Sequence, residues 1–139
     1  MLRRLLIVLG VVVLAATAYP TPARAAVQFE WDYAVRGTPP DGLECATYLG
    51  AKACYQEYGD TLWVKDLASD GFSAIARWWD YIDEGGGRYK LYRQGACRNK
   101  LGSGAWGYCN KNFWETNMLV STPCLYDGDT GRFYPADCD

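Results

Sequence analysis

The sequence predicts an all-β fold, a small antiparallel β-sandwich or a partly open barrel stabilised by disulfides. Three observations indicate this fold. Short segments alternate between apolar and polar residues, Gly- and Asp-rich turns separate them, and six cysteines occur among 139 residues. Several short strands at this spacing, with no long amphipathic helical pattern, are typical of a sandwich or a barrel.

The clearest strand covers residues 61–66. Leu62 and Val64 fall on one face, while Trp63 falls on the other with the polar neighbours. This period of two is the pattern of a half-buried strand. The segment therefore predicts one strand with a core face.

A second long strand is predicted for residues 73–82. Asp70 and Gly71 precede it, and this pair favours a tight turn because Gly accepts positive φ and Asp hydrogen-bonds nearby backbone. The order of strand, tight loop and strand predicts a hairpin in which residues 61–66 and 73–82 are partners.

The other segments are shorter. A break is expected at residues 37–42 because two consecutive prolines cannot sit in a ladder. Residues 45–54 are interpreted as a small loop or a single helical turn. Further strands are expected at residues 88–94, 106–113 and 118–126, and a last strand starts at residues 132–134 and closes near Cys138. Residues 27–33 are expected to form an edge strand or an ordered arm.

The first 25 residues are predicted to be a secretory signal peptide. Arg3 and Arg4 precede an apolar run, and Ala23-Arg24-Ala25 supplies a cleavage site of the A-x-A type. The alternative is an uncleaved membrane anchor, but the apolar run is short for a membrane span. We therefore expect residues 26–139 to form a single secreted β domain with no membrane contact after cleavage.

The charge balance argues against some partners. The whole chain has 14 basic and 16 acidic residues, and the predicted leader removes three arginines, which leaves a net charge of about −5. An acidic chain without a Lys/Arg cluster is a poor candidate for binding nucleic acid. We expect an extracellular monomer that binds no nucleic acid.

The cysteines indicate three disulfides, because an even number in a small secreted chain is typical of a disulfide framework. Closeness along the chain predicts the pairs Cys45–Cys54, Cys97–Cys109 and Cys124–Cys138. Cys97 and Cys109 end and begin consecutive predicted strands, and Cys124 and Cys138 bracket the final turn, so each pair is expected to come within bonding distance.

The sequence gives little support for a metal site or for a catalytic nucleophile. Histidine is absent, which removes the commonest zinc ligand and every Ser/His or Cys/His arrangement. Calcium at Asp60, Asp66, Asp70 and Asp80 is an alternative, but no spaced Asp loop with a terminal Glu occurs. We expect no metal, no cofactor and no catalytic residue.

Three short motifs resemble a known group. These are Y-G-D at 58–60, V-K-D at 64–66 and D-G-F-S-A at 70–74. The pattern resembles small secreted actinobacterial β-proteins that contain disulfides, and the likeness covers roughly two thirds of the predicted mature chain. No activity is established for that group, so the resemblance implies a fold and a compartment only.

The aromatic content supplies the candidate binding residues. The chain has six Trp and eleven Tyr, and adjacent Trp78 and Trp79 must face opposite ways in a strand. Exposed rings on a sheet face favour stacking on sugars or a protein-binding patch. The simpler interpretation is that aromatic bulk fills a small core. The candidate binding residues are Trp63, Trp79, Tyr81 and Tyr92.

These observations favour a non-catalytic extracellular binding module for a glycan or a protein surface, and Trp63 side by side with Trp79 would favour the glycan. An alternative is an inhibitor of an extracellular hydrolase that presents residues 98–108 as a protruding loop. A second alternative is a small hydrolase with facing carboxylates, such as Asp80 with Asp83 or Glu84.

Overall fold

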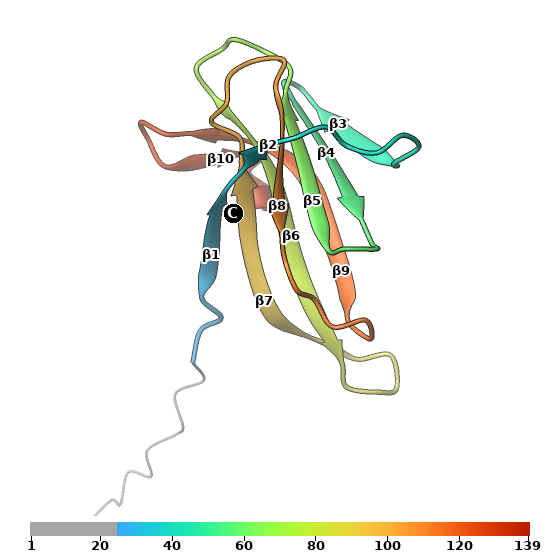
Figure 1. Ribbon diagram of the computed structural model, residues 1–139. Helices are drawn as coiled ribbons and strands as arrows, with labels where there is room; N and C mark the ends of the chain where they lie inside the picture. The colour runs from blue at the N-terminus through green and yellow to red at the C-terminus, as the bar shows by residue number, and fades with distance from the viewer. Residues whose placement is uncertain (1–24) are drawn as a thin grey trace, which may run out of the picture.

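The computed structural model describes residues 25–139 and folds them into two packed sheets (Figure 1). A single short 3-10 turn follows the last strand of this part of the chain. The elements are β1 (Phe29–Tyr33), β2 (Val35–Arg36), β3 (Cys45–Tyr48), β4 (Ala51–Gln56), β5 (Thr61–Asp66), β6 (Ser73–Asp83), β7 (Tyr89–Arg98), β8 (Trp106–Asn110), β9 (Met118–Asp127), β10 (Arg132–Tyr134) and η1 (Ala136–Cys138).

The two sheets each contain five strands. Sheet A has the order β1-β7-β6-β9-β10, and sheet B has the order β2-β8-β5-β4-β3. All neighbours are antiparallel except β1 and β7, which run parallel. The predicted all-β sandwich is confirmed, and the sheets do not close into a barrel.

The predicted hairpin between β5 and β6 is wrong in its pairing. Both strands and the turn form where expected, and Asp70 Oδ1 accepts from the Phe72 N–H at 3.0 Å. However, β5 lies in sheet B and β6 in sheet A, so the connection crosses between the layers. A local period of two shows that each strand has a buried face, but it cannot show which sheet that strand joins.

The interpretation of residues 45–54 as a loop or helical turn is also wrong. They form the hairpin of β3 and β4, and Leu49 adopts φ 46° in its turn. Ala51 and Ala53 face the core and are almost fully buried. Alanine has a low strand propensity, which concealed the alternation.

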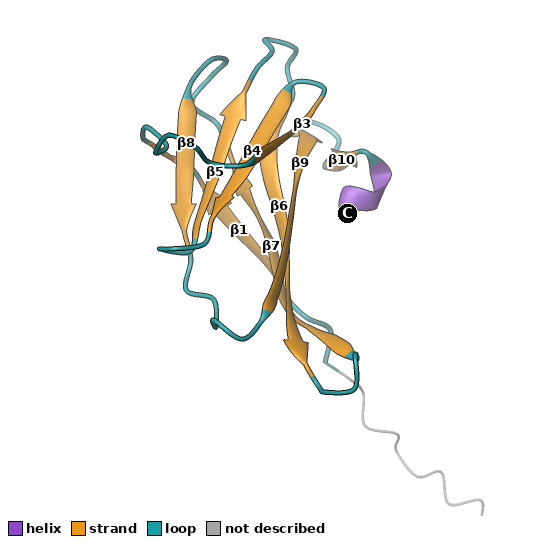
Figure 2. Ribbon diagram, turned by 90° about the vertical axis from the view of Figure 1, so that its right-hand side faces the viewer, coloured by secondary structure: helices purple, strands orange, loops and turns teal. Residues whose placement is uncertain are grey.

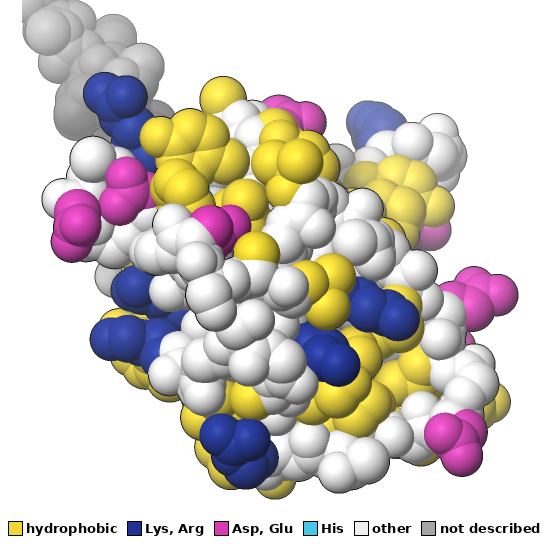
Figure 3. All heavy atoms as spheres, turned by 90° about the horizontal axis from the view of Figure 1, so that it is seen from above, with side chains coloured by type: hydrophobic (Ala, Val, Ile, Leu, Met, Phe, Trp, Pro, Cys, Tyr) yellow, Lys and Arg dark blue, Asp and Glu magenta, His cyan; other side chains and the backbone are white. Residues whose placement is uncertain are grey.

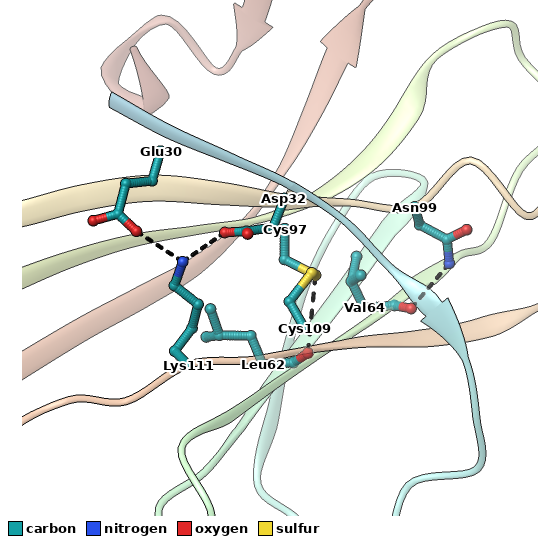
Figure 4. Close-up of a disulfide and its surroundings, with 8 residues drawn as sticks. All are labelled: Glu30, Asp32, Leu62, Val64, Cys97, Asn99, Cys109 and Lys111. Atoms are coloured by element: carbon teal, nitrogen blue, oxygen red, sulfur yellow. Dashed lines mark hydrogen bonds and ion pairs between the residues drawn. A yellow bond between two sulfur atoms is a disulfide. The ribbon is translucent and has the colours of Figure 1, made fainter. Parts of the chain in front are cut away.

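The main core lies between the sheets and is crossed by a disulfide. Trp78 of β6 packs there with Leu62 and Val64 of β5. Cys97 of β7 is joined to Cys109 of β8, so this bridge links sheet A to sheet B (Figure 4). The predicted pair is confirmed, but its strands lie in opposite sheets.

A charged cluster closes one edge of this core. Lys111 Nζ lies 2.8 Å from Glu30 and 2.7 Å from Asp32, between the two carboxylates (Figure 4). Arg93 donates to both oxygens of Glu30, and this hydrogen bond lowers the pKa of the Glu30 carboxyl. The cluster ties β1 and β7 to the segment that follows β8.

A second, smaller core lies on the outer side of sheet A. Phe133 and Cys138 pack there on Ile75, and Cys124 of β9 is bridged to Cys138 in η1. The remaining bridge joins Cys45 to Cys54, directly opposite each other in the β3–β4 pair. All three predicted disulfides are confirmed.

Three disulfides are typical of an oxidising, extracellular compartment. Within residues 25–139, no helix is long and apolar enough to cross a membrane. The predicted signal peptide lies outside the described residues except for Ala25.

Candidate functional site

The outer surface of sheet A has a covered upper half and an open lower half. β10 and η1 lie over the upper half (Figure 2). No second layer built from residues 25–139 lies over the lower half, where β6, β7 and β9 continue downward. Among the outward-pointing side chains there, Tyr89, Met118 and Val120 are exposed, and Trp79, Tyr81 and Leu91 are half-buried.

Trp79 and Tyr81 lie on the open half because of the alternation along β6. Trp78 and Asp80 point into the core and are fully buried, so the residues between and after them point outward. The prediction that adjacent Trp78 and Trp79 face opposite ways is confirmed. Arg77 packs 4.1 Å from the Trp79 ring and fixes the upper boundary of the surface.

Apolar side chains from both neighbouring strands complete this surface. Val120 lies opposite Trp79, and Met118 and Leu91 lie opposite Tyr81. Val120 and Met118 are 41% and 39% exposed. We call this surface the open face. Its residues are Trp79, Tyr81, Tyr89, Leu91, Met118 and Val120.

A shallow hollow extends the open face along β7 towards the start of the described chain. Its lining residues are Ala25, Val27, Glu84, Tyr89, Lys90 and Leu91. The Gln94 amide donates to the Val27 carbonyl at 3.3 Å, which holds this first segment beside the sheet. The open face and the hollow thus form one continuous surface.

Trp63 does not belong to this surface, and its predicted exposure is wrong. The ring lies on the outer side of sheet B but is only 7% exposed. It packs 5.1 Å from the Tyr108 ring and donates to Gln56. The connection from β2 to β3 crosses this sheet and brings Gly37 against both rings (Figure 1). Trp63 and Trp79 therefore lie in different sheets and not side by side.

Tyr92 lies at the edge of the open face. The register of β6 and β7 shifts between Asp80 and Tyr81, and Tyr92 is the extra residue on β7. Its ring stacks on Trp114 at 5.2 Å, and both are exposed. Trp114 was not predicted as a candidate because it follows β8 in an irregular segment without a periodic pattern.

The aromatic rings at the upper end are partly covered by cations. Lys52 and Lys65 lie over the Trp106 ring at 5.9 and 5.6 Å. Lys100 lies 5.4 Å from the Tyr33 ring. Seen from above, Lys and Arg side chains rest against hydrophobic ones (Figure 3). The Trp79 ring of the open face is likewise covered in part by a cation, since Arg77 lies 4.1 Å from it.

The aspartates considered as calcium ligands each accept a hydrogen bond from a different group. Asp60 accepts from Tyr55, Asp66 from the Ala68 N–H, and Asp80 from Asn117. In the described part of the chain, no three His, Cys, Asp or Glu residues lie close enough to hold a metal. The structure does not bring the four aspartates together.

The suggested catalytic pair of Asp80 with Asp83 or Glu84 does not face across a cleft. Asp80 points into the core, whereas Asp83 and Glu84 are exposed at the β6–β7 turn. Asp83 accepts from the Gly85 N–H at 2.7 Å and so stabilises that turn.

The loop between β7 and β8 is rigidly held. Asn99 is buried and donates to the carbonyls of Val64 and Ala105, and Gly104 donates to the Asp66 carbonyl. The loop lies beside the β5–β6 connection at the upper end (Figure 1). The loop has the rigidity that an inhibitor loop requires. However, it packs against the β5–β6 connection and so does not protrude alone.

The residues of the Y-G-D motif shape a turn. Gly59 and Asp60 adopt φ 102° and 48°, values that Gly accepts freely and Asp tolerates better than most residues. Asp60 also holds Tyr55. These residues therefore have a structural role in the β4–β5 turn.

Comparison with known protein families, with curated proteins and with solved structures finds no match to this chain. The resemblance to small secreted actinobacterial proteins stays a prediction.

Asp80 gives a stability prediction. Burial raises the pKa of its carboxyl, while the hydrogen bond from Asn117 lowers it, and the second oxygen has no partner. A carboxyl whose pKa is higher in the folded state contributes its full stabilisation at pH values below the ordinary pKa of Asp. This stabilisation is lost as the pH rises through the pKa of the folded state. We expect Asp80→Asn to raise the free energy of unfolding at pH 7 by about 1 kcal/mol.

Urea unfolding at several pH values tests this prediction. The difference between the variant and the original protein should shrink as the pH falls from 7 to 4, because protonation of Asp80 removes the buried charge that the Asn variant lacks at every pH. A less stable variant at pH 7 would show instead that the ionised carboxylate is well accommodated.

Proposed function

We propose that the protein is a non-catalytic extracellular binding module and that its open face binds a polysaccharide. One observation carries the proposal. Trp79 and Tyr81 stand two residues apart on one strand and point outward from sheet A, where both are half-buried beside the exposed Met118 and Val120. Such residues are about 7 Å apart along a strand, so their side chains form a short aromatic row.

The chemistry of the surroundings supports a sugar ligand. Aromatic rings supply the apolar area, and the neutral hydroxyl groups of Tyr81, Tyr89 and Thr122 supply both donors and acceptors. Sugar rings present the same combination of apolar C–H faces and hydroxyl rims. The extracellular part of the proposal is supported by the predicted leader and by the three disulfides.

Depletion of the secreted protein from solution by insoluble cellulose, chitin and bacterial cell-wall sacculi tests this function. At least one of the three should retain the protein. Trp79→Ala should weaken retention about tenfold, and Tyr81→Ala should weaken it by a similar factor, since a central aromatic contact contributes more than 1 kcal/mol.

Tyr58→Ala is the matched control, because Tyr58 is 89% exposed in the β4–β5 turn and lies off the open face. It should retain full binding, and circular dichroism should show that all variants are folded. Retention that is unaffected by both open-face variants would contradict the proposal. Release of soluble sugar would show an enzyme.

A further inference from the structure

A cavity of about 230 Å³ lies between the sheets at their lower end, away from the open face. The β4–β5 turn and the segment that joins β8 to β9 meet there (Figure 2). We call it the end cavity. Its lining residues are Tyr55, Glu57, Asp60, Phe113, Trp114, Glu115, Asn117 and Leu119.

Aromatic rings form much of its wall. Tyr55 and Phe113 pack edge to face at 6.2 Å. Trp114 is 58% exposed and is held in place by its stack on Tyr92. Ring faces attract cations through the negative face of the ring quadrupole.

The charged residues of the wall are all acidic. Glu57 and Asp60 come from the β4–β5 turn, and Glu115 comes from the β8–β9 segment; no Lys or Arg is part of the lining. Outside the lining, Arg93 lies 5.5 Å from the Phe113 ring but is paired with Glu30, and Lys111 is paired with Glu30 and Asp32. The carboxylates of the end cavity therefore have no cationic partner in the wall itself.

A buried carboxylate lies behind this wall. Asp80 Oδ1 accepts from Asn117 Nδ2 at 2.8 Å, and Oδ2 has no hydrogen-bond partner although it is fully buried. Asp80 lies opposite Leu119 in the β6–β9 pair, and both Leu119 and Asn117 line the end cavity. A cation in the cavity would offset the cost of this buried group.

The arrangement fits an organic cation better than a metal ion. The acidic residues of the described chain do not converge in a group that could hold a metal. Aromatic walls are of little use to a strongly hydrated metal ion but suit an alkylated head group. The cavity is smaller than those that enclose drug-sized ligands, so it has room for a single side-chain-sized group.

We propose that the end cavity binds an alkylammonium or guanidinium group, the chemistry shared by free amines and by Lys or Arg side chains. The proposal is independent of polysaccharide binding at the open face. In both sources, the positive head would lie among the carboxylates and the alkyl part against Phe113 and Trp114.

Chemical-shift titration of the ¹⁵N-labelled secreted protein with butylammonium and butylguanidinium chloride at pH 7 and low salt tests the proposal. Saturable shifts should be confined to the β4–β5 turn and the β8–β9 segment. 1-Butanol is the neutral control of similar shape and should bind at least tenfold more weakly. Putrescine and the peptide Gly-Gly-Lys-Gly-Gly distinguish a free amine from a peptide side chain.

Asp60→Asn and Glu115→Gln should each weaken butylammonium binding about threefold, the size expected for loss of one partly exposed charge contact. Asn is tolerated at positive φ and can still accept from Tyr55, so Asp60→Asn preserves the turn. Glu84→Gln, at the β6–β7 turn, is the matched control and should change nothing. Equal binding of 1-butanol, or undiminished binding by both cavity variants, would overturn the proposal.

Discussion

Replacing both Cys97 and Cys109 with alanine is expected to lower the free energy of unfolding by about 4 kcal/mol. Their loop spans 12 residues in sequence separation, and its closure accounts for about 3 kcal/mol of that loss in the loop-entropy account. The remainder comes from the buried sulfur atoms, which lie between the two sheets. Urea unfolding under non-reducing conditions measures the effect.

The double variant of Cys45 and Cys54 is the matched control. Its sequence separation of 9 gives a similar loop contribution of about 2.5 kcal/mol. Cys45 is exposed, however, and this bridge joins two strands of the same sheet. Equal losses in the two double variants would contradict the conclusion that the bridge between the sheets also stabilises their packing.

Arg77→Ala is expected to lower the free energy of unfolding by about 4 kcal/mol, as much as loss of the Cys97–Cys109 disulfide. Arg77 is fully buried on the outer side of sheet A, yet its guanidinium donates to the carbonyls of Cys138, Trp78 and Gly95. Burial lowers its pKa to about 10, so the group stays charged at neutral pH. The variant would leave these carbonyls without a donor and would loosen the C-terminal segment.

Arg98→Ala is the control for this second prediction. Arg98 is half-buried, donates to Ser73 and lies 4.6 Å from the Tyr126 ring. We expect a loss of about 1 kcal/mol, because water can reach the groups left behind. Urea unfolding of both variants measures the two losses in free energy of unfolding. A loss for Arg77→Ala no larger than that for Arg98→Ala would contradict our account.

The parts of the fold that were predictable depend on neighbours in sequence. β5 begins and ends where alternation and turn residues place it. β10 begins as predicted at Arg132 but ends at Tyr134, and η1 replaces the rest of the predicted last strand. The disulfides pair as closeness along the chain predicts. Sheet membership was not predictable, because β5 and β6 each have a buried face that would suit either pairing.

The candidate site was predictable to a similar extent. The adjacent tryptophans predicted that their rings face opposite ways, and the structure shows that Trp78 is the buried one and Trp79 the outer one. The burial of Trp63 was hidden because its cover comes from Gly37, a residue remote in sequence. Solvent can reach the open face because β10 and η1 cover only the upper half of sheet A. No local sequence pattern predicts how far these two elements extend over the sheet.

Hydroxyl-radical footprinting tests most directly whether the open face is the contact surface. The secreted protein would be oxidised free and while bound to the polysaccharide that retains it, and then mapped by mass spectrometry. We predict protection of Trp79, Tyr81 and Met118, with Tyr58 and Trp114 oxidised equally in both states. Protection of the β7–β8 loop in place of these residues, or no protection at the open face, would contradict the account.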